Sequence, residues 1–455
     1  MTTFSKLTLA SVLAANVIFP GMAKADYCDA QSDPSAYTEK FRPHAPIFGN
    51  PVEGFLYTGR DKHTRVNLSV SEADLLEKIS ASLQSNGTYL SIVLTAPRLA
   101  TASNSTSNVE FERLQNTAKD DYLELLKQLE DVGVIAPNLL DMTTLPNGEA
   151  PKFSFDQDTH WTPNGALLAG LSLREAVTNS TDLVFSEIGK VYDFGEQLEF
   201  VHPGVFAEAL EVACDLEIPD EVINFPAIVR ASSDVSQAEL LFADVEGDQV
   251  IVALGTSFSN GLSYDKFFWT DALRYSLQVD VENYGVHAGG VDTSFLSYLL
   301  ADGRVETPNL IVWEIPWVTL RSDWEDELRQ IYGTLHGACV DDGLSRKVST
   351  SLPVTGEWTT LFDGLSLQDL LTFNVEGLAT GRLQVRTTYS NGQTRQFMFT
   401  RSDRLPNAID HPAWTVFLGD TDLGDFDGTP TTIEVKVPGQ TSSLSIQAAA
   451  CSSLF

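Results

Sequence analysis

Runs of mostly apolar residues constrain the fold more than any other feature of the sequence. They lie at 89–96, 250–254 and 310–315. A run that is apolar on both faces is typical of a strand buried on both sides, as the strands of parallel sheets are. Between the runs are amphipathic stretches with helical spacing, at 68–83, 111–132 and 166–177. This alternation predicts an α/β domain with a parallel sheet and helices on both of its faces. Shorter strands are expected at 54–57 and 134–140.

The last quarter of the chain has a different pattern. From residue 344 onward, short stretches of alternating apolar and polar residues are separated by turns, and no helical pattern intervenes. Asn391-Gly392 divides two such stretches, and Asn-Gly is the strongest short-range signal for a hairpin. The strands are expected at 383–389, 394–400, 414–418, 431–437 and 443–448. We therefore predict a β-sandwich of the carbohydrate-binding type over 344–455, joined to the α/β domain over 26–343.

The first 25 residues have the pattern of a cleavable secretory signal. Lys6 precedes an apolar stretch at 7–20, and Ala23-Lys24-Ala25 provides a small-x-small cleavage site. The apolar stretch is too short to cross a bilayer, and no later stretch has about 18 consecutive apolar residues. We predict an exported, soluble protein in the periplasm, whose mature chain begins at Asp26.

Export also bears on the four cysteines, since an oxidising compartment favours disulfide bonds. These cysteines are Cys28, Cys214, Cys339 and Cys451. Four cysteines allow three pairings, and the spacing does not choose among them. No Cys-x-x-Cys is present, which argues against a zinc ribbon or a thioredoxin-like site.

A carboxylate and an imidazole lie two positions apart, at Asp158 and His160. In an extended segment, side chains at i and i+2 point to the same side, so these two groups can meet. Such a pair can activate a nucleophile, with Asp158 fixing the tautomer of His160 and His160 taking a proton. The alternatives are an aspartate that caps a turn, or two ligands of a metal. No other histidine or cysteine nearby has ligand spacing, so we predict no metal and no cofactor.

A candidate nucleophile follows the apolar run at 250–254. Ser257 lies in Gly255-Thr256-Ser257-Phe258-Ser259, just beyond the predicted end of a strand, where open α/β sheets carry their chemistry. The segment is similar to a nucleophile elbow with the second glycine replaced, and the Ser257 amide could serve as an oxyanion donor. Ser259 is a rival nucleophile, and an ordinary polar turn is the alternative interpretation.

Taken together, Asp158-Thr159-His160-Trp161-Thr162-Pro163-Asn164-Gly165 and Gly255-Thr256-Ser257-Phe258-Ser259 resemble the periplasmic alginate O-acetyltransferases of the SGNH-hydrolase-like group. The resemblance covers nearly the whole chain. It implies Ser257 as nucleophile, His160 as base and Asp158 as its orienting partner. It also implies disulfides that pair Cys28 with Cys214 and Cys339 with Cys451.

The implied activity is transfer of acetyl groups to O2 or O3 of mannuronate in alginate. The implied partners are the anionic polysaccharide, membrane or periplasmic proteins that supply the acetyl group, and an exopolysaccharide export complex. A polysaccharide acetylesterase with the same three residues is one alternative. A non-catalytic, polysaccharide-binding scaffold of the export complex is another.

The net charge of −33 makes nucleic acid a poor partner, yet alginate is itself a polyanion. The charge is uneven, because residues 345–455 carry a net charge of only −3. A group of arginines in this part provides guanidinium forks that suit uronate carboxylates, although ordinary solvated positions are the alternative. These are Arg382, Arg386, Arg395, Arg401 and Arg404. Trp161 and Trp317 are either packing residues, the default for aromatics, or stacking surfaces for a sugar ring.

Overall fold

The structure is a computed structural model that describes residues 28–50, 54–62, 67–102, 109–231, 249–260, 266–319, 324–336, 346–363, 369–375, 381–405, 413–418, 430–441 and 444–452. The predicted signal peptide, residues 1–25, lies outside these ranges. So does the predicted boundary between residues 343 and 344. None of the helices in the described part of the chain has the length and hydropathy needed to cross a membrane.

The N-terminal two thirds of the chain mixes helices with strands. Its strands are β1 (Ile47–Phe48), β2 (Tyr57–Thr58), β3 (Tyr89–Leu94), β4 (Tyr192–His202), β5 (Glu221–Arg230), β6 (Ile251–Leu254), β7 (Val281–Asn283) and β8 (Leu310–Ile315). Its helices are α1 (Gly59–Lys62), α2 (Val70–Ser85), α3 (Arg98–Thr101), α4 (Val109–Asp131), α5 (Pro163–Ser180), α6 (Val205–Cys214), α8 (Trp269–Leu277), α9 (Thr293–Leu299) and α10 (Glu325–Leu335). Short 3-10 helices lie at Pro34–Ala36, Arg42–His44 and Trp317–Thr319.

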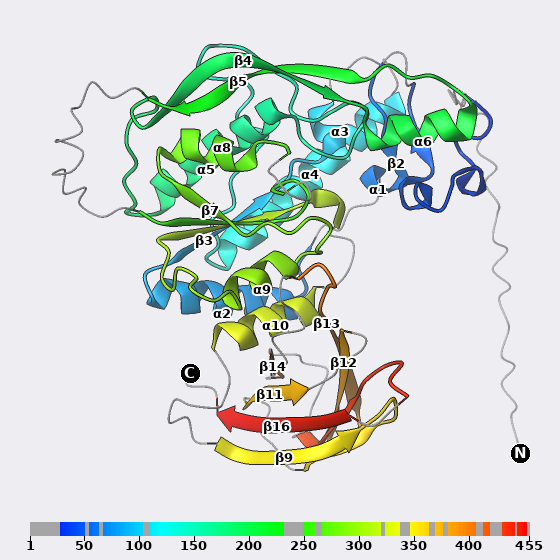
Figure 1. Cartoon of the computed structure of the whole chain (residues 1–455), viewed down its shortest axis with the longest axis vertical. Coiled ribbons are helices and arrows are strands. Elements are labelled where there is room, and N and C mark those ends of the chain that lie inside the picture. The colour runs from blue at the N-terminus through cyan, green and yellow to red at the C-terminus, as the bar shows by residue number, and fades with distance from the viewer. Residues whose placement is uncertain are drawn as a thin grey trace, which may run out of the picture.

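The central sheet has the strand order β3-β8-β6-β7, and all of its neighbouring strands are parallel. Its three longest strands coincide with the apolar runs predicted from the sequence. Figure 1 shows α5 and α8 on one side of this sheet and α2, α9 and α10 on the other. Both faces are therefore covered, which explains why the strands are apolar at successive positions. The α/β architecture with a parallel sheet is confirmed.

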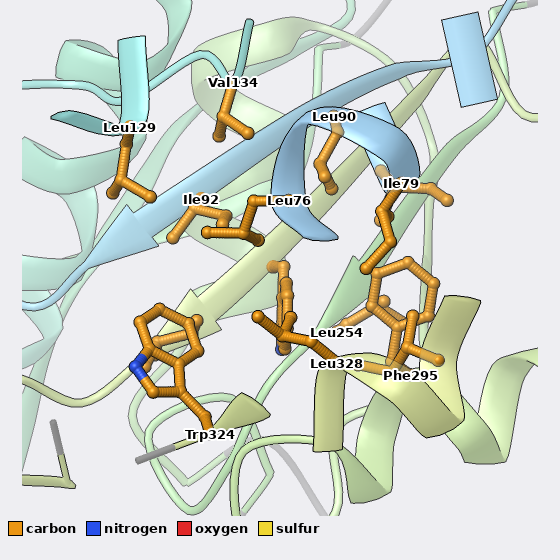
Figure 2. Packing of buried hydrophobic residues seen from close by; sticks show 14 of the residues in the cluster. Leu76, Ile79, Leu90, Ile92, Leu129, Val134, Leu254, Phe295, Trp324 and Leu328 are labelled. Atoms are coloured by element: carbon orange, nitrogen blue, oxygen red, sulfur yellow. The ribbon is translucent and has the colours of Figure 1, made fainter. Parts of the chain in front are cut away.

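Two separate hydrophobic clusters lie on the two faces of the sheet. On one face, residues of α2, α4, α9 and α10 pack against alternate residues of the strands. Figure 2 shows this cluster, in which Leu76 and Ile79 of α2 approach Leu90 and Ile92 of β3. On the other face, apolar residues of α5 and α8 pack against Val93, Ile251 and Val312. Such burial is the main source of stability in a sheet of this kind.

Several local features differ from the sequence-based expectation. The strand expected at 54–57 is present only as β2, Tyr57–Thr58, and the strand β7 was not predicted. The stretch at 134–140 forms only a single bridge, between Ser91 and Ile135, and not a strand. Pro137 follows within two residues, and a proline has no N–H to continue a ladder. The long antiparallel pair β4–β5 was not predicted. It crosses over α5 and α8 at the top of the molecule in Figure 1.

The C-terminal part is all β in its described residues. Its strands are β9 (Arg346–Val354), β10 (Thr359–Asp363), β11 (Asp369–Val375), β12 (Arg382–Tyr389), β13 (Thr394–Thr400), β14 (Ala413–Phe417), β15 (Pro430–Lys436) and β16 (Leu444–Ser452). They form two antiparallel sheets, ordered β10-β15-β12-β13 and β14-β11-β16-β9, around one hydrophobic cluster. The predicted hairpin joins β12 to β13, and Gly392 in its turn has a φ of 83°, which favours glycine. The strands β9, β10 and β11 were not predicted.

Helix α10 joins the two parts of the molecule. It lies between the central sheet and the C-terminal strands in Figure 1 and packs against β14. A Cβ at Gly333 of α10 would lie 2.7 Å from the carbonyl oxygen of Thr415, so the helix needs glycine for this close approach. Arg329 of α10, which is fully buried, donates to the Phe417 carbonyl at 3.0 Å. The junction is thus a packed interface and fixes one part relative to the other.

The N-terminal arm is attached to α6 by a disulfide bond between Cys28 and Cys214. This bond confirms the first of the two implied pairings. Cys339 lies outside the described residues, and of Cys451 only the backbone in β16 is described, so the second pairing stays a prediction.

Replacing Cys28 and Cys214 together by alanine should lower the free energy of unfolding by about 2–5 kcal/mol. The bridge joins residues with a sequence separation of 186, so it restricts the unfolded chain. Urea denaturation of the wild-type protein and the variant measures this difference. Cys28→Ala alone also opens the bridge and should give a similar midpoint. Identical midpoints for wild type and double variant would contradict a stabilising role.

Candidate active site

The segment with Asp158 and His160 leads directly into helix α5. Thr162 is the N-cap residue, and its side chain accepts a hydrogen bond from the Gly165 amide at 2.9 Å. Pro163 occupies the first turn, where a missing N–H costs nothing. A Cβ at Gly165 would lie 1.9 Å from the Phe153 carbonyl oxygen, so only glycine fits. The sequence Thr-Pro-Asn-Gly therefore fixes how the chain enters the helix, and with it the position of His160.

Buried charges fix the other side of this loop. The guanidinium of Arg98, only 4% exposed, donates to the carbonyl oxygens of Leu56 and Phe155 at 2.8 Å each. The carboxylate of Glu221 on β5 accepts from the Asp156 amide at 2.9 Å. Charge-assisted hydrogen bonds of this kind are stronger than neutral ones, so the loop is held on both sides.

Ser257 follows the carboxyl end of β6, in a tight turn. The Ser259 and Asn260 amides both donate to the Thr256 carbonyl, at 3.1 and 2.9 Å. Ser257 is partly exposed, whereas Ser259 is fully buried and its hydroxyl donates to Glu314 at 2.9 Å. The rival nucleophile is therefore turned into the protein interior. Among the described residues, no backbone carbonyl accepts from the Ser257 amide, which makes this amide a candidate donor to a developing oxyanion.

Asp158, His160 and Ser257 form one chain of polar contacts. Nδ1 of His160 lies 2.5 Å from Oδ1 of Asp158, and Nε2 lies 2.8 Å from Oγ of Ser257. A carboxylate can only accept, so the neutral ring carries its proton on Nδ1, and the Ser257 hydroxyl donates to Nε2. The His160 ring is held between Phe258 and Phe267, with ring centroids 4.5 and 4.3 Å away. The structure thus brings together the three residues that the sequence singles out.

Asp158 is buried and has more partners than His160 alone. Its Oδ2 accepts from the Val205 amide at 2.8 Å, at the N-terminus of α6. Nε2 of His202 lies 3.0 Å from the same oxygen, within ion-pair distance but outside hydrogen-bond geometry. Burial by itself would raise the pKa of Asp158, but the imidazoles of His160 and His202 outweigh it and hold this pKa well below its usual value. Asp158 is therefore a stable anion facing His160.

A second buried carboxylate lies beneath the Ser257 turn. Glu314 on β8 accepts from the Thr256 amide at 2.7 Å and from the Ser259 hydroxyl at 2.9 Å. Burial raises its pKa to about 7, and the hydrogen bonds from Thr256 and Ser259 offset only part of that effect. No cation is among the causes of the shift, in contrast to the imidazoles at Asp158.

Basic groups from three segments lie around His287 and the Phe267 ring that stacks on His160. Nζ of Lys266 is 5.3 Å from the centroid of Phe267, the ring that stacks on His160. His287 follows a segment that is hydrogen-bonded to the Ser257 turn, since the Val286 amide donates to Gly255 at 2.9 Å. Burial lowers the pKa of His287, and the positive groups of His160, Arg404 and Lys266 lower it further. Arg404 of the C-terminal part therefore lies within electrostatic range of His287, across the junction.

The five arginines predicted to bind polymer are not equivalent. Arg395 pairs with Glu325 of α10. Arg401 is buried over Trp414, with 4.3 Å between the guanidinium carbon and the ring centroid, and burial lowers its pKa to about 10. Arg395 is held in this ion pair and Arg401 is buried, so neither guanidinium presents an open surface to a polymer, in contrast to the binding role expected of them.

The remaining three arginines are closer to solvent. Arg386 pairs with Glu434 at 2.6 Å, while Arg382 and Arg404 are exposed. As predicted from strand alternation, Arg382 and Arg386 lie on one face of β12. These three remain candidates for binding an anionic polymer.

Trp161 and Trp317 are core residues, 1% and 3% exposed. Trp161 packs against Trp269 at a centroid distance of 4.8 Å, and Trp317 packs against Tyr122 at 5.6 Å. Neither ring face is open to a sugar, so the stacking alternative is corrected in favour of packing. In the described part of the chain, no group of three or more His, Cys, Asp or Glu side chains is arranged to hold a metal ion.

Comparison with known proteins identifies the family. Residues 53–317, more than half of the chain, match the family model described as SGNH hydrolase-like domain, acetyltransferase AlgX. The chain belongs to the AlgX family. This confirms the resemblance predicted from the two motifs around His160 and Ser257.

Members of the AlgX family and related proteins are similar over large parts of the chain. Alginate biosynthesis protein AlgX of Pseudomonas putida is 24% identical over 380 residues, covering 80% of this chain and 77% of that protein. The probable alginate O-acetylase AlgJ of Pseudomonas putida is 29% identical over 252 residues, covering 53% of this chain and 61% of that protein. The solved structure of Pseudomonas aeruginosa AlgX has a TM-score of 0.71 at 20% identity and covers 94% of this chain and 99% of that one. The fold is therefore shared over nearly the full length.

Sequence reasoning missed His202, Glu314 and the basic groups at His287 and Lys266. His202 ends a strand of a ribbon that was not predicted, so nothing linked it to Asp158. Glu314 did carry a signal, because it is a carboxylate inside an otherwise apolar strand. A charge is expensive to bury, so such a position calls for partners nearby.

Glu314→Gln should stabilise the protein at high pH only. The pKa of Glu314 is raised to about 7 from its ordinary value of 4.5, so the folded state holds this proton more tightly than the unfolded chain. That contribution is complete below about pH 4.5 and is lost as pH rises through about 7. The neutral glutamine avoids the loss, giving a gain of roughly 2–3 kcal/mol at pH 8.5 and little change at pH 5. Thermal denaturation at both pH values checks this; a gain that is equal at both would contradict it.

Proposed function

We propose that this protein is an O-acetyltransferase that adds acetyl groups to hydroxyls of mannuronate residues in alginate. The observation that carries the proposal is the continuous contact from Asp158 through His160 to Ser257, with distances of 2.5 and 2.8 Å, at the carboxyl end of a parallel strand. Membership of the AlgX family supports this choice of chemistry. So do the relatives named alginate biosynthesis protein and probable alginate O-acetylase.

In the first half-reaction, Ser257 Oγ attacks the carbonyl carbon of an acetyl donor while His160 Nε2 takes the hydroxyl proton. The buried anion of Asp158 stabilises the imidazolium that forms and keeps the ring in place. The Ser257 amide is a candidate donor to the oxyanion. Collapse of this intermediate expels the leaving group, which takes the proton from His160, and leaves an acetyl ester on Ser257.

In the second half-reaction, His160 removes a proton from a sugar hydroxyl as that oxygen attacks the acetyl ester. The oxyanion forms again, and Ser257 leaves with the proton returned by His160. Transfer to a sugar rather than to water requires that the polymer be held against the ester. Lys266, His287 and Arg404 are basic groups from both parts of the molecule that act electrostatically on one another, and we assign them the uronate carboxylates.

The proposed setting is the periplasm, in agreement with the secretory signal predicted at residues 1–25. The acetyl donor is then supplied by membrane or periplasmic partner proteins of an exopolysaccharide export complex. The C-terminal sandwich serves as the polysaccharide-binding module, with Arg382 and Arg386 on an outer strand face.

Ser257→Ala should abolish acetylation, with a loss of several orders of magnitude, because the residues of such a triad act as a unit. Mass spectrometry of mannuronate oligomers incubated with an activated acetyl ester measures it. Ser172→Ala, which removes a hydroxyl bonded within α5, is the matched control and should behave as wild type. Release of acetate without acetylated sugar would instead indicate the esterase. Absence of any reaction in the folded wild-type protein would favour the scaffold.

Arg404→Ala should raise the KM for mannuronate oligomers by roughly tenfold, since a charge-assisted hydrogen bond contributes about 1.5 kcal/mol or more, and should weaken the salt dependence of binding. Hydrolysis of a small neutral acetyl ester should be unchanged, because that substrate has no carboxylate. Arg113→Ala, an exposed arginine paired with Glu110 on α4, is the control. Equal KM values for Arg404→Ala and wild type would remove Arg404 from the binding site.

A further inference from the structure

The turn that carries Ser257 is fastened from below by a single buried carboxylate. Glu314 is fully buried on β8, next to β6 in the sheet. Its Oε2 accepts from the Thr256 amide at 2.7 Å and from the Ser259 hydroxyl at 2.9 Å. The Thr256 hydroxyl lies 3.2 Å from both carboxylate oxygens. Thr256 and Ser259, one position before Ser257 and two positions after it, are thus held by the same side chain.

The carboxylate fits against this turn because residue 255 is a glycine and has no side chain. A Cβ at Gly255 would lie 2.4 Å from Oε2 of Glu314 and 2.2 Å from Oγ of Ser259. Gly255 therefore leaves the space that the carboxylate fills. Its role is steric and does not depend on an unusual φ angle. The substitution of any other residue here would push Glu314 away from the Thr256 amide.

We propose that Glu314 is a positioning residue, which holds the Ser257 hydroxyl and amide in the reactive arrangement through Thr256 and Ser259. Thr256 is 6% exposed and Ser259 is fully buried, so water does not replace Glu314 as the acceptor for their donors. Without that acceptor, the turn must shift to satisfy the Thr256 amide and Ser259 hydroxyl. A displacement of about 1 Å is enough to cost on the order of 100-fold in rate.

Glu314 does not touch the reacting atoms, so its role differs from those of His160 and Asp158. The inference rests on the proposed function, because it takes Ser257 to be the nucleophile. The inference adds a second requirement for reactivity. Ser257 must be held in place by Glu314 from the side of the sheet, as well as by the hydrogen bond to His160. A charged carboxylate, a protonated carboxyl group and a glutamine amide each place an acceptor oxygen at the Oε2 position, so each can meet this requirement.

The test is labelling of Ser257 by a fluorophosphonate, followed by mass spectrometry of the full-length protein. In this reaction the Ser257 oxygen bonds to phosphorus, the P–F bond breaks, fluoride leaves, and His160 takes the hydroxyl proton. The assay needs neither the acetyl donor nor the polymer. The variants are Glu314→Met, which fills the volume without an acceptor, and Glu314→Gln, which keeps an acceptor oxygen.

We expect Glu314→Met to lower the maximal labelling rate by about 100-fold with little change in the probe's half-saturating concentration. Glu314→Gln should stay within about threefold of wild type, since it keeps the hydrogen bonds from Thr256 and Ser259. Glu72→Met is the matched control. Glu72 is an equally buried carboxylate that accepts from the Ser69 and Trp324 amides, and its loss should affect stability but not labelling.

Ser259→Ala is a second variant, which tests the same role if Glu314→Met does not fold. It removes one of the hydrogen bonds to Glu314 and should lower the rate by about five- to tenfold. Wild-type labelling rates in folded Glu314→Met, or in Ser259→Ala if the former does not fold, would overturn the role of Glu314 alone. Absence of labelling in the wild-type protein would overturn Ser257 as nucleophile and the role of Glu314 with it.

Discussion

The arrangement around His160 depends on keeping the carboxylate of Asp158 charged while it is buried. An isolated buried carboxylate would take up a proton, because desolvation penalises the anion. Here the imidazoles of His160 and His202 and the Val205 amide at the start of α6 compensate that cost. Helix α6 is in turn tied at its other end, through the disulfide bond of Cys214, to the N-terminal arm. Distant segments of the chain therefore converge on one anion.

Asp158 and Glu314 are both buried carboxylates, but their pKa values are shifted in opposite directions. Asp158 faces two imidazoles, and its pKa is held well below the usual value. Glu314 faces only neutral donors of Thr256 and Ser259, and burial raises its pKa to about 7. In the proposed function, the first carboxylate stabilises the imidazolium that forms at His160 during the reaction. The second contributes as a hydrogen-bond acceptor under the Ser257 turn, a role that does not require a permanent charge.

In the proposed function an acidic chain acts on an acidic polymer, so its positive groups must be concentrated where the polymer binds. With a net charge of −33, the molecule as a whole repels alginate. The arginines of the C-terminal sandwich serve two purposes instead. Arg395 ties the sandwich to α10 through its ion pair with Glu325, and Arg404 acts electrostatically on His287 from the sandwich side. In the proposed function, the sandwich thus contributes to the active site as well as to polymer binding.

The sequence by itself determined the strands β3, β6 and β8 of the central sheet, the C-terminal strands β12 to β16, and the choice of Asp158, His160 and Ser257 as site residues. Apolar runs and local motifs encode these features, because burial and turn chemistry act on residues close in the chain. Only the tertiary structure decided that Trp161 is core, that Ser259 points inward, and which of the five arginines are exposed. It alone showed His202 and Glu314 as partners of the site. Their contacts join strands distant in sequence, and no local pattern records which buried groups will meet across a fold.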